Sequence, residues 1–166
     1  MELKKTVRLA MLLSLGIVLN LVESMIPFIG SIIPGLKLGL TNIVILLVLY
    51  LYGFKDALTL SIMRVFIIGI LRTGLFNIIF FFSLSGALFS VLAMAISKRL
   101  TKLSIIGISI IGALFHSFGQ IIIAILYINM EIIYYLPWLL LFSLPTGFLV
   151  GKIANEVLSF SNSVFK

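Results

Sequence analysis

The sequence predicts an all-α fold, a polytopic membrane protein built as a bundle of six transmembrane helices. Composition is the first observation: of 166 residues, 62% are hydrophobic and only 10% are charged, and the mean hydropathy is +1.33. A soluble domain of this length cannot bury so much apolar surface, so we expect lipid to be the solvent for most of the chain. The apolar residues also form long runs, and basic residues gather at the ends of those runs.

Six apolar segments approach the roughly 20 residues that a helix needs to cross a bilayer. In chain order they are residues 7–26, 38–52, 57–71, 74–96, 104–128 and 132–150. The second and third are short, so they either extend into their flanks or tilt little. The connections are tight and contain no linker or repeat, which predicts a single domain over residues 1–166. The first segment contains Asn20 and Glu23 and no small-residue cleavage site follows it, so we do not expect a cleaved signal peptide.

The distribution of Lys and Arg predicts the orientation of the bundle. If the N-terminus is cytoplasmic, the outer side holds only Lys37 and Arg72, and Arg64 lies within the third segment. Basic residues are enriched in cytoplasmic loops, so this asymmetry places both termini inside. The cytoplasmic side then carries Lys4, Lys5, Arg8, Lys55, Lys98, Arg99, Lys102, Lys152 and Lys166.

Pairs of small residues at helical spacing are typical of close helix packing in lipid. For most of them, packing inside the bundle is the expected role. Ala10 with Ser14, near the cytoplasmic end of the first segment, is the pair that could instead contact a partner membrane subunit, and Gly147 with Gly151 is a second candidate.

Hydrogen-bonding and ionisable side chains gather in the predicted outer half of the bundle. Asn20 and Glu23 lie towards the outer end of the first segment and Thr41 near the start of the second. Polar residues within a membrane are costly and usually face the bundle interior or a cavity, so we expect a pocket open to the outside. The candidate substrate-binding residues are Glu23, Lys37, Asn42, Arg64, Asn77, His116, Gln120, Tyr134 and Trp138.

Several of these residues have a simpler structural explanation. Glu23 can form a structural ion pair with Lys37 or Arg64. Tyr134 and Trp138 fit an interfacial aromatic belt. His116 alone can be an ordinary interior histidine, although Gln120 lies one turn away. Arg64 is the strongest candidate for a cavity, because a mid-span arginine needs a counter-charge, water or a bound anion.

The sequence also excludes several functions. It has no Gly-rich phosphate loop ending in Lys-Ser/Thr, so the chain cannot drive ATP-dependent transport alone. Asp56 is the only aspartate, there is one His and there is no Cys, so neither a paired-carboxylate magnesium site nor a zinc site is expected. We therefore expect no cofactor and no catalytic residues. We also expect no nucleic-acid partner, because the basic residues lie at the ends of the apolar segments, as membrane topology requires.

Residues 34–42 (PGLKLGLTN), the segment around Arg64, residues 112–120 (GALFHSFGQ) and residues 134–137 (YYLP) together resemble the Gx transporter family, also labelled heptaprenyl diphosphate synthase component I. This family is similar to the S components of energy-coupling factor (ECF) transporters. The resemblance implies a six-helix, substrate-binding protein of the bacterial plasma membrane that works with a coupling membrane subunit and two ATPases. It also implies that the loop of residues 27–37 closes the pocket and that Ala10 and Ser14 meet the coupling subunit, although the usual double-alanine form is absent.

These considerations lead to one hypothesis and one alternative. In the first, a small anionic or polar-headed metabolite (a vitamin, quinone or prenyl precursor) enters from outside. Lys37 and Arg64 hold its acidic or carbonyl groups, and His116 and Gln120 orient it. In the alternative, the chain is a non-catalytic accessory subunit of a heptaprenyl diphosphate synthase, since it lacks the aspartate-rich motifs of such enzymes.

Overall fold

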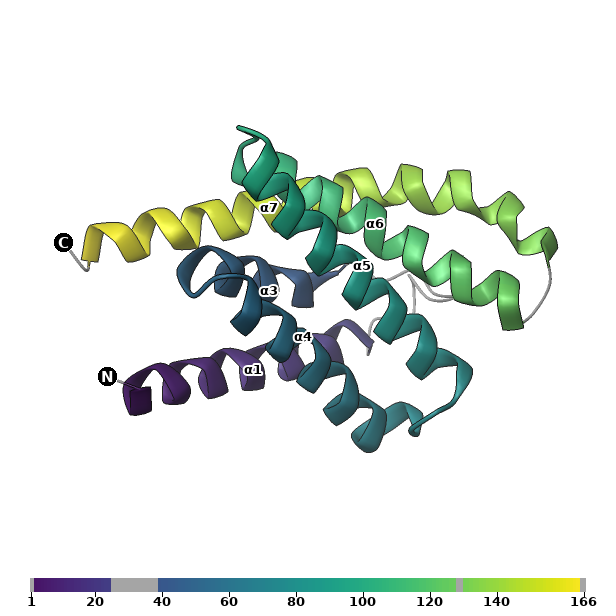
Figure 1. Cartoon of the computed structure of the whole chain (residues 1–166), viewed down its shortest axis with the longest axis horizontal. Helices are drawn as coiled ribbons and strands as arrows, with labels where there is room; N and C mark the ends of the chain where they lie inside the picture. Colours follow the sequence, from purple (N-terminus) through teal and green to yellow (C-terminus); the bar gives the residue numbers. More distant parts are fainter. Residues whose placement is uncertain (1, 25–38, 128–129, 165–166) are drawn as a thin grey trace.

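In a computed structural model of the chain, residues 2–24, 39–127 and 130–164 are described, and the regular secondary structure of this part is entirely helical, with short connections between the helices (Figure 1). The predicted all-α fold class is therefore confirmed. The elements are α1 (Glu2–Ser24), α3 (Leu40–Leu51), α4 (Phe54–Ile68), the π-helical turn η1 (Gly69–Thr73), α5 (Ile78–Leu100), α6 (Ile105–Tyr127), the 3₁₀ turn η2 (Met130–Tyr135) and α7 (Leu136–Val164).

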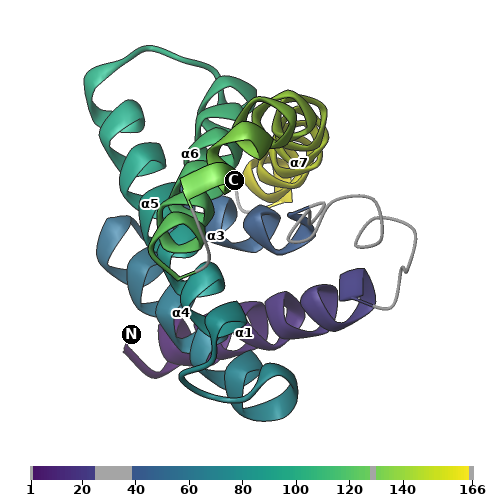
Figure 2. The same ribbon diagram turned by 90° about the vertical axis from the view of Figure 1, so that its right-hand side faces the viewer.

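Helix α3 lies at the centre of the bundle, with the other helices around it (Figure 2). Every residue from Ile43 to Leu49 is at most 8% exposed. A helix that is apolar on all sides has no face to offer to water, so it becomes the core around which amphipathic neighbours pack. The core cluster joins α3 to Leu60 of α4, Val91 of α5 and Ala154 of α7.

In the described part of the chain, four helices are long and apolar enough to cross a membrane: α1, α5, α6 and α7. The predicted count of six spans is not confirmed, because α3 has 12 residues, a length of about 18 Å against the ~30 Å of a hydrocarbon core. Helix α4 has 15 residues and continues into the π-helical turn.

The predicted bounds of the last segment, residues 132–150, were wrong at both ends. Helix α7 begins at Leu136, after the 3₁₀ turn, and runs to Val164. Pro145 lies inside it, and the Thr146 hydroxyl donates to the carbonyl oxygens of Phe142 and Ser143. Pro145 itself has no N–H to donate to the Leu141 carbonyl oxygen one turn earlier.

Small residues bring α6 and α7 into backbone contact. A Cβ on Gly147 would lie 2.8 Å from the Ile110 Cα, and one on Gly151 would lie 2.7 Å from the Ile106 Cα. Both glycines are buried. The suggestion that this pair faces a partner subunit was therefore wrong, because the glycines are covered by α6 of the same chain. Ala10 and Ser14 of α1, in contrast, are exposed.

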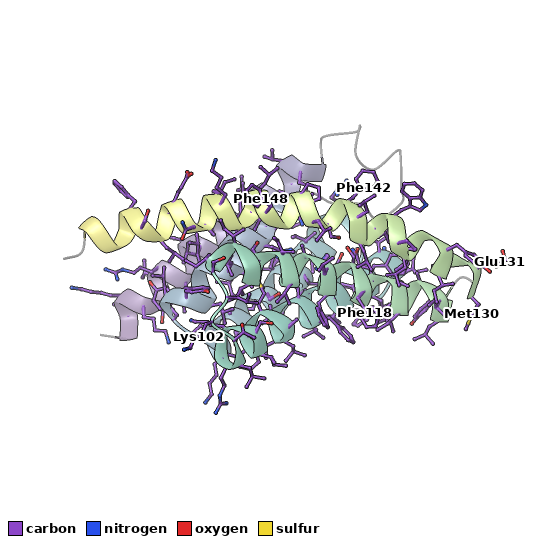
Figure 3. The ribbon with its side chains drawn as sticks, turned by 90° about the horizontal axis from the view of Figure 1, so that it is seen from above. Lys102, Phe118, Met130, Glu131, Phe142 and Phe148 are labelled. Carbon is purple, nitrogen blue, oxygen red and sulfur yellow. The ribbon has the colours of Figure 1, made fainter. Side chains whose placement is uncertain are left out.

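The two ends of the bundle differ in charge. Lys5 of α1 pairs with Asp56 of α4 at 2.8 Å, and the Lys98 ammonium of α5 donates to the Leu49 carbonyl oxygen of α3 at 2.9 Å. These contacts place the start of α1, the end of α3, the start of α4 and the end of α5 together, and we call this the basic end. Lys102 lies there, whereas Met130 and Glu131 lie at the opposite end (Figure 3).

Aromatic residues of α6 and α7 point away from the bundle. Phe118, Phe142 and Phe148 project from its surface in Figure 3 and are between 40% and 49% exposed. Exposed aromatic and aliphatic side chains over most of two long helices are unfavourable in water and favourable in lipid.

Candidate functional site

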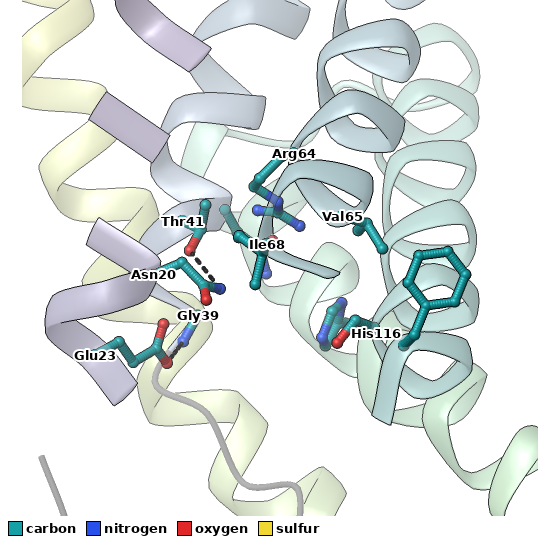
Figure 4. Close-up of a pocket in the computed structure, with 11 residues that line it drawn as sticks. Asn20, Glu23, Gly39, Thr41, Arg64, Val65, Ile68 and His116 are labelled. Atoms are coloured by element: carbon teal, nitrogen blue, oxygen red, sulfur yellow. Dashed lines mark hydrogen bonds between the residues drawn. The ribbon is translucent and has the colours of Figure 1, made fainter. Parts of the chain in front are cut away.

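A polar pocket lies in the half of the bundle opposite the basic end, where the end of α1, the start of α3, α4, α5 and the middle of α6 meet (Figure 4). Its cavity volume is about 30 Å³, space for roughly two water-sized groups. The lining residues are Asn20, Glu23, Gly39, Thr41, Asn42, Arg64, Val65, Ile68, Phe80, Ser83 and His116.

One wall of the pocket is held together by hydrogen bonds between α1 and the start of α3. The backbone N–H of Gly39 donates to Glu23 Oε1 at 2.6 Å, and Asn20 Nδ2 donates to Thr41 Oγ1 at 3.4 Å. Gly39 has φ +74°, a left-handed conformation that glycine adopts without a steric penalty. This turn aims the Gly39 N–H at the carboxylate, so Glu23 ties the entry of α3 to the end of α1.

Arg64 supplies the positive charge of the pocket. Arg64 is only 5% exposed, and its Nη1 atom has no hydrogen-bond partner among the described residues. The Glu23 carboxylate attracts the guanidinium electrostatically. Buried charges are normally paired and hydrogen-bonded, because desolvation costs several kcal/mol per ion. The Nη1 group of this buried guanidinium can therefore donate a hydrogen bond to a further acceptor, such as a bound ligand.

His116 enters the pocket from α6, on the side opposite Glu23 (Figure 4). Its imidazole packs directly against Gly86 of α5: a Cβ on Gly86 would lie 2.8 Å from His116 Cε1. The Ser85 hydroxyl next to it donates to the Gly119 carbonyl oxygen at 2.7 Å, which fixes the register between the two helices. Helix packing thus determines where the imidazole lies.

The structure brings four of the predicted site residues together, namely Glu23, Asn42, Arg64 and His116. Gln120 is buried one turn farther along α6 but does not line this pocket. The Asn77 side chain caps α5 by accepting a hydrogen bond from the Phe80 N–H at 2.9 Å. Lys37 lies outside the described residues.

Tyr134 and Trp138 stand apart from the pocket. Tyr134 in η2 is 77% exposed and Trp138 near the start of α7 is 57% exposed, which agrees with the alternative of an interfacial aromatic belt. Their role in substrate binding stays a prediction.

Several lining residues were not among the predicted substrate ligands. Asn20 and Thr41 could have been predicted from the sequence, since both are polar and lie near the outer ends of their segments. The grounds for predicting Ser83, which is a small residue on α5, were weaker. The apolar lining residues Val65, Ile68 and Phe80 could not have been predicted, because an apolar residue in a membrane segment does not reveal which direction it faces.

The chemistry available here is recognition by charge and hydrogen bonding. Within the described ranges, no group of three or more His, Cys, Asp or Glu side chains could hold a metal ion. One guanidinium, one carboxylate, one imidazole, amides and hydroxyls surround the cavity, with Val65, Ile68 and Phe80 as its apolar part. Such a lining suits a ligand with a polar head and an apolar body.

Comparison with known proteins gives one match. The family model described as heptaprenyl diphosphate synthase component I matches residues 12–157, which is most of the chain. No curated protein and no solved structure matches. The family predicted from the sequence motifs is therefore confirmed.

Proposed function

This chain belongs to the heptaprenyl diphosphate synthase component I family, and from that premise we propose that it is a substrate-binding membrane subunit of an ATP-driven uptake transporter of the ECF type. Component I is an accessory subunit and not itself the catalyst. In the proposed role, the chain binds a small molecule on the outer side of the bacterial plasma membrane and hands it to a coupling membrane subunit with ATPase subunits.

The observation that carries this proposal is the position of Arg64. A buried guanidinium, whose Nη1 has no hydrogen-bond partner among the described residues, stands in a cavity where α1, α3, α4, α5 and α6 meet, in the half of the bundle opposite the basic end. Because basic residues mark the cytoplasmic side, this half is the outer one. A buried charge is costly, and ligand binding is a function that accounts for retaining it.

The division of labour follows from the sequence. The chain has no phosphate-binding loop, so energy for uptake has to come from another subunit. Ala10 and Ser14 provide an exposed small-residue surface on α1, near the basic end, where a helix of the coupling subunit can approach closely.

Two measurements test the proposal. Small molecules released from gently purified protein are identified by mass spectrometry, and affinity purification from native membranes shows which subunits accompany the chain. We expect a stoichiometric metabolite, and a coupling protein with ATPases. Absence of any small molecule together with absence of an ATPase module would exclude the transport role.

The family description favours a second candidate, an accessory subunit of a heptaprenyl diphosphate synthase. In that role the chain would bring the catalytic subunit to the membrane. Co-purification with a prenyl synthase, and a change in product chain length when the two are combined, would support it over transport.

A further inference from the structure

A second cavity, separate from the polar pocket, lies between α1 and α4, which run side by side (Figure 2). Its volume is about 220 Å³, against about 30 Å³ for the polar pocket. Its lining consists of Thr6, Leu9, Ala10 and Leu13 from α1 and Asp56, Thr59, Leu60 and Met63 from α4. Each set has the spacing i, i+3, i+4, i+7, which places its members on one face of the helix. Two facing helix stripes thus form a groove, which we call the α1–α4 groove.

The α1–α4 groove is polar at one end and apolar at the other. At the basic end, Lys5 of α1 and Asp56 of α4 form an ion pair at 2.8 Å that joins the two helices. Two turns farther along, the lining ends at Leu13 and Met63. Since basic residues mark the cytoplasmic side, the polar end faces the cytoplasmic leaflet and the apolar end faces the membrane interior. A phospholipid of that leaflet has its head group and its acyl chains in the same order.

The groove opens onto a surface that suits lipid. Only 11% of the apolar stretch of α1 is buried, against 28–44% for the corresponding stretches of α5, α6 and α7. Met63, which lines the groove, is 47% exposed, and Met11 on α1 is 68% exposed. An empty apolar groove would leave its lining without van der Waals contacts, and hydrocarbon chains of the bilayer can supply them.

The width of the groove favours an acyl chain over a partner helix. A helix with its side chains is about 10–12 Å across. The Lys5–Asp56 pair holds α1 and α4 together at one end, and Leu9 and Leu60 pack both helices on the core cluster around α3. A partner helix can therefore lie over α1 and α4, but it cannot enter between them without separating them. A hydrocarbon chain, one methylene group wide, can enter.

The charge of the basic end favours an anionic head group. The sequence contains five acidic residues, and two of them, Glu23 and Glu131, lie in the opposite half of the bundle. At most Glu2, Asp56 and Glu156 remain to offset the nine basic residues predicted on the cytoplasmic side. The basic residues therefore outnumber every acidic residue available to them. Clusters of basic residues beside a membrane attract the anionic lipids of the cytoplasmic leaflet.

We propose that the α1–α4 groove binds an acyl chain of an anionic phospholipid from the cytoplasmic leaflet, with the lipid head group at the basic end. This inference goes beyond the proposed function and requires no substrate. Ala10 lines the groove and also belongs to the surface proposed for the coupling subunit. The bound lipid therefore belongs to the chain before that subunit docks.

The first test compares dioleoyl phosphatidylglycerol with dioleoyl phosphatidylcholine, which share their acyl chains and differ in head-group charge. Native mass spectrometry of the full chain in mild detergent measures the dissociation constant of each one-to-one complex. We expect phosphatidylglycerol to bind at least fivefold more tightly. Equal binding of the two lipids, or tighter binding of phosphatidylcholine, would overturn the assignment of an anionic lipid.

Photocrosslinking locates the acyl chain. A phosphatidylglycerol with a diazirine in one acyl chain should label residues 6–13 and 56–63 of the parent chain. Thr59→Phe fills the groove and should lower both the labelling and the affinity at least fivefold. Val7→Phe is the control, because Val7 is 48% exposed on α1 and does not line the groove. Labelling confined to α5, α6 and α7 would overturn the site, and this result does not depend on whether Thr59→Phe folds.

The same variants separate lipid from a protein occupant and from the proposed function. If the parent binds no phosphatidylglycerol and Thr59→Phe loses a co-purifying membrane subunit or a second copy of the chain, the groove is a protein-binding site and the lipid proposal is wrong. If the lipid binds in the groove but no metabolite and no ATPase module are found, the lipid proposal holds and the transport function fails.

Discussion

Gly86 and His116 are packed so closely that no side chain fits between them. A Cβ on Gly86 would lie 2.8 Å from Cε1, 3.0 Å from Nδ1 and 3.0 Å from the carbonyl oxygen of His116. The contact joins α5 to α6 at the wall of the polar pocket. The position of the imidazole is therefore set by a glycine on a neighbouring helix.

Gly86→Ala should displace His116. The new methyl group meets both the ring and the backbone of residue 116, and overpacking of this kind costs about 1–3 kcal/mol. We expect a lower unfolding temperature in detergent. We also expect weaker binding of the small molecule that mass spectrometry identifies in the purified parent protein. Gly107→Ala is the control, since its Cβ would meet Leu103 only at an ordinary 3.4 Å. The role assigned to Gly86 fails if both variants behave alike.

Glu23→Ala should loosen the entry of α3. The Gly39 N–H would lose its acceptor at 2.6 Å in a partly buried site, where the cost is below the roughly 1–3 kcal/mol of a fully buried unsatisfied donor. Glu23→Gln retains an acceptor oxygen and should be milder. Denaturation in mixed detergent micelles measures the difference. Equal loss in both variants would show that the charge, rather than the hydrogen bond, stabilises this junction.

Ser143→Ala should weaken the contact between α6 and α7. Ser143 donates to the Leu139 carbonyl oxygen at 2.7 Å, so in its 2.6 Å contact with Ser117 it is the acceptor. Hydrogen bonds between membrane helices average about 0.6 kcal/mol and reach about 1.7 kcal/mol, and we expect a destabilisation in this range. Ser90→Ala removes a hydroxyl with no partner among the described residues and should be neutral or stabilising. If Ser90→Ala were less stable than Ser143→Ala, the hydrogen bonds assigned to Ser143 would be contradicted.

Gly151→Ala tests whether this glycine belongs to the interior of the bundle. Its Cβ would lie 2.7 Å from the Ile106 Cα, a backbone atom that cannot rotate away. We expect the isolated protein to be destabilised by about 1–3 kcal/mol or more. Gly16→Ala is the comparison, because its nearest contact is the Thr41 methyl group at 3.5 Å. An isolated protein of parental stability would point to an external role for Gly151.

Ala10→Phe tests the proposed docking surface. Ala10 is exposed on α1, so a large side chain should leave ligand binding unchanged while blocking close approach of a partner helix. We expect loss of co-purifying coupling subunit by at least tenfold. Met11→Phe, at a residue that is 68% exposed, controls for added bulk on the same helix. Retention of the partner by the Ala10 variant would exclude this surface.

The pattern of apolar runs located most of the helices correctly. The predicted segments at residues 104–128 and 7–26 differ from α6 and α1 by a few residues. The predicted start of α5 was four residues too early, because Asn77 caps the helix and the residues from Gly74 to Asn77 lie outside it. Residues of this connection are also apolar, so hydropathy alone did not show where the helix began.

The candidate site was predicted in part. Depth in the membrane can be estimated from position along each segment, which is why Glu23, Arg64 and His116 were grouped and why they line one cavity. The direction in which a side chain points around a helix that is apolar on all sides cannot be estimated in this way. Gln120 was therefore grouped with the pocket although it does not line it.

By itself, the sequence determined that this chain is all-α, that its helices suit lipid, that its basic residues mark one end, and that it belongs to its family. These properties depend on composition and on the order of residues along the chain. Only the tertiary structure decided that α3 is a buried central helix, that Gly147 and Gly151 are covered by α6, and that Gly86 makes room for His116. Those outcomes depend on how the helices rotate and cross, which is set by packing between segments far apart in the sequence.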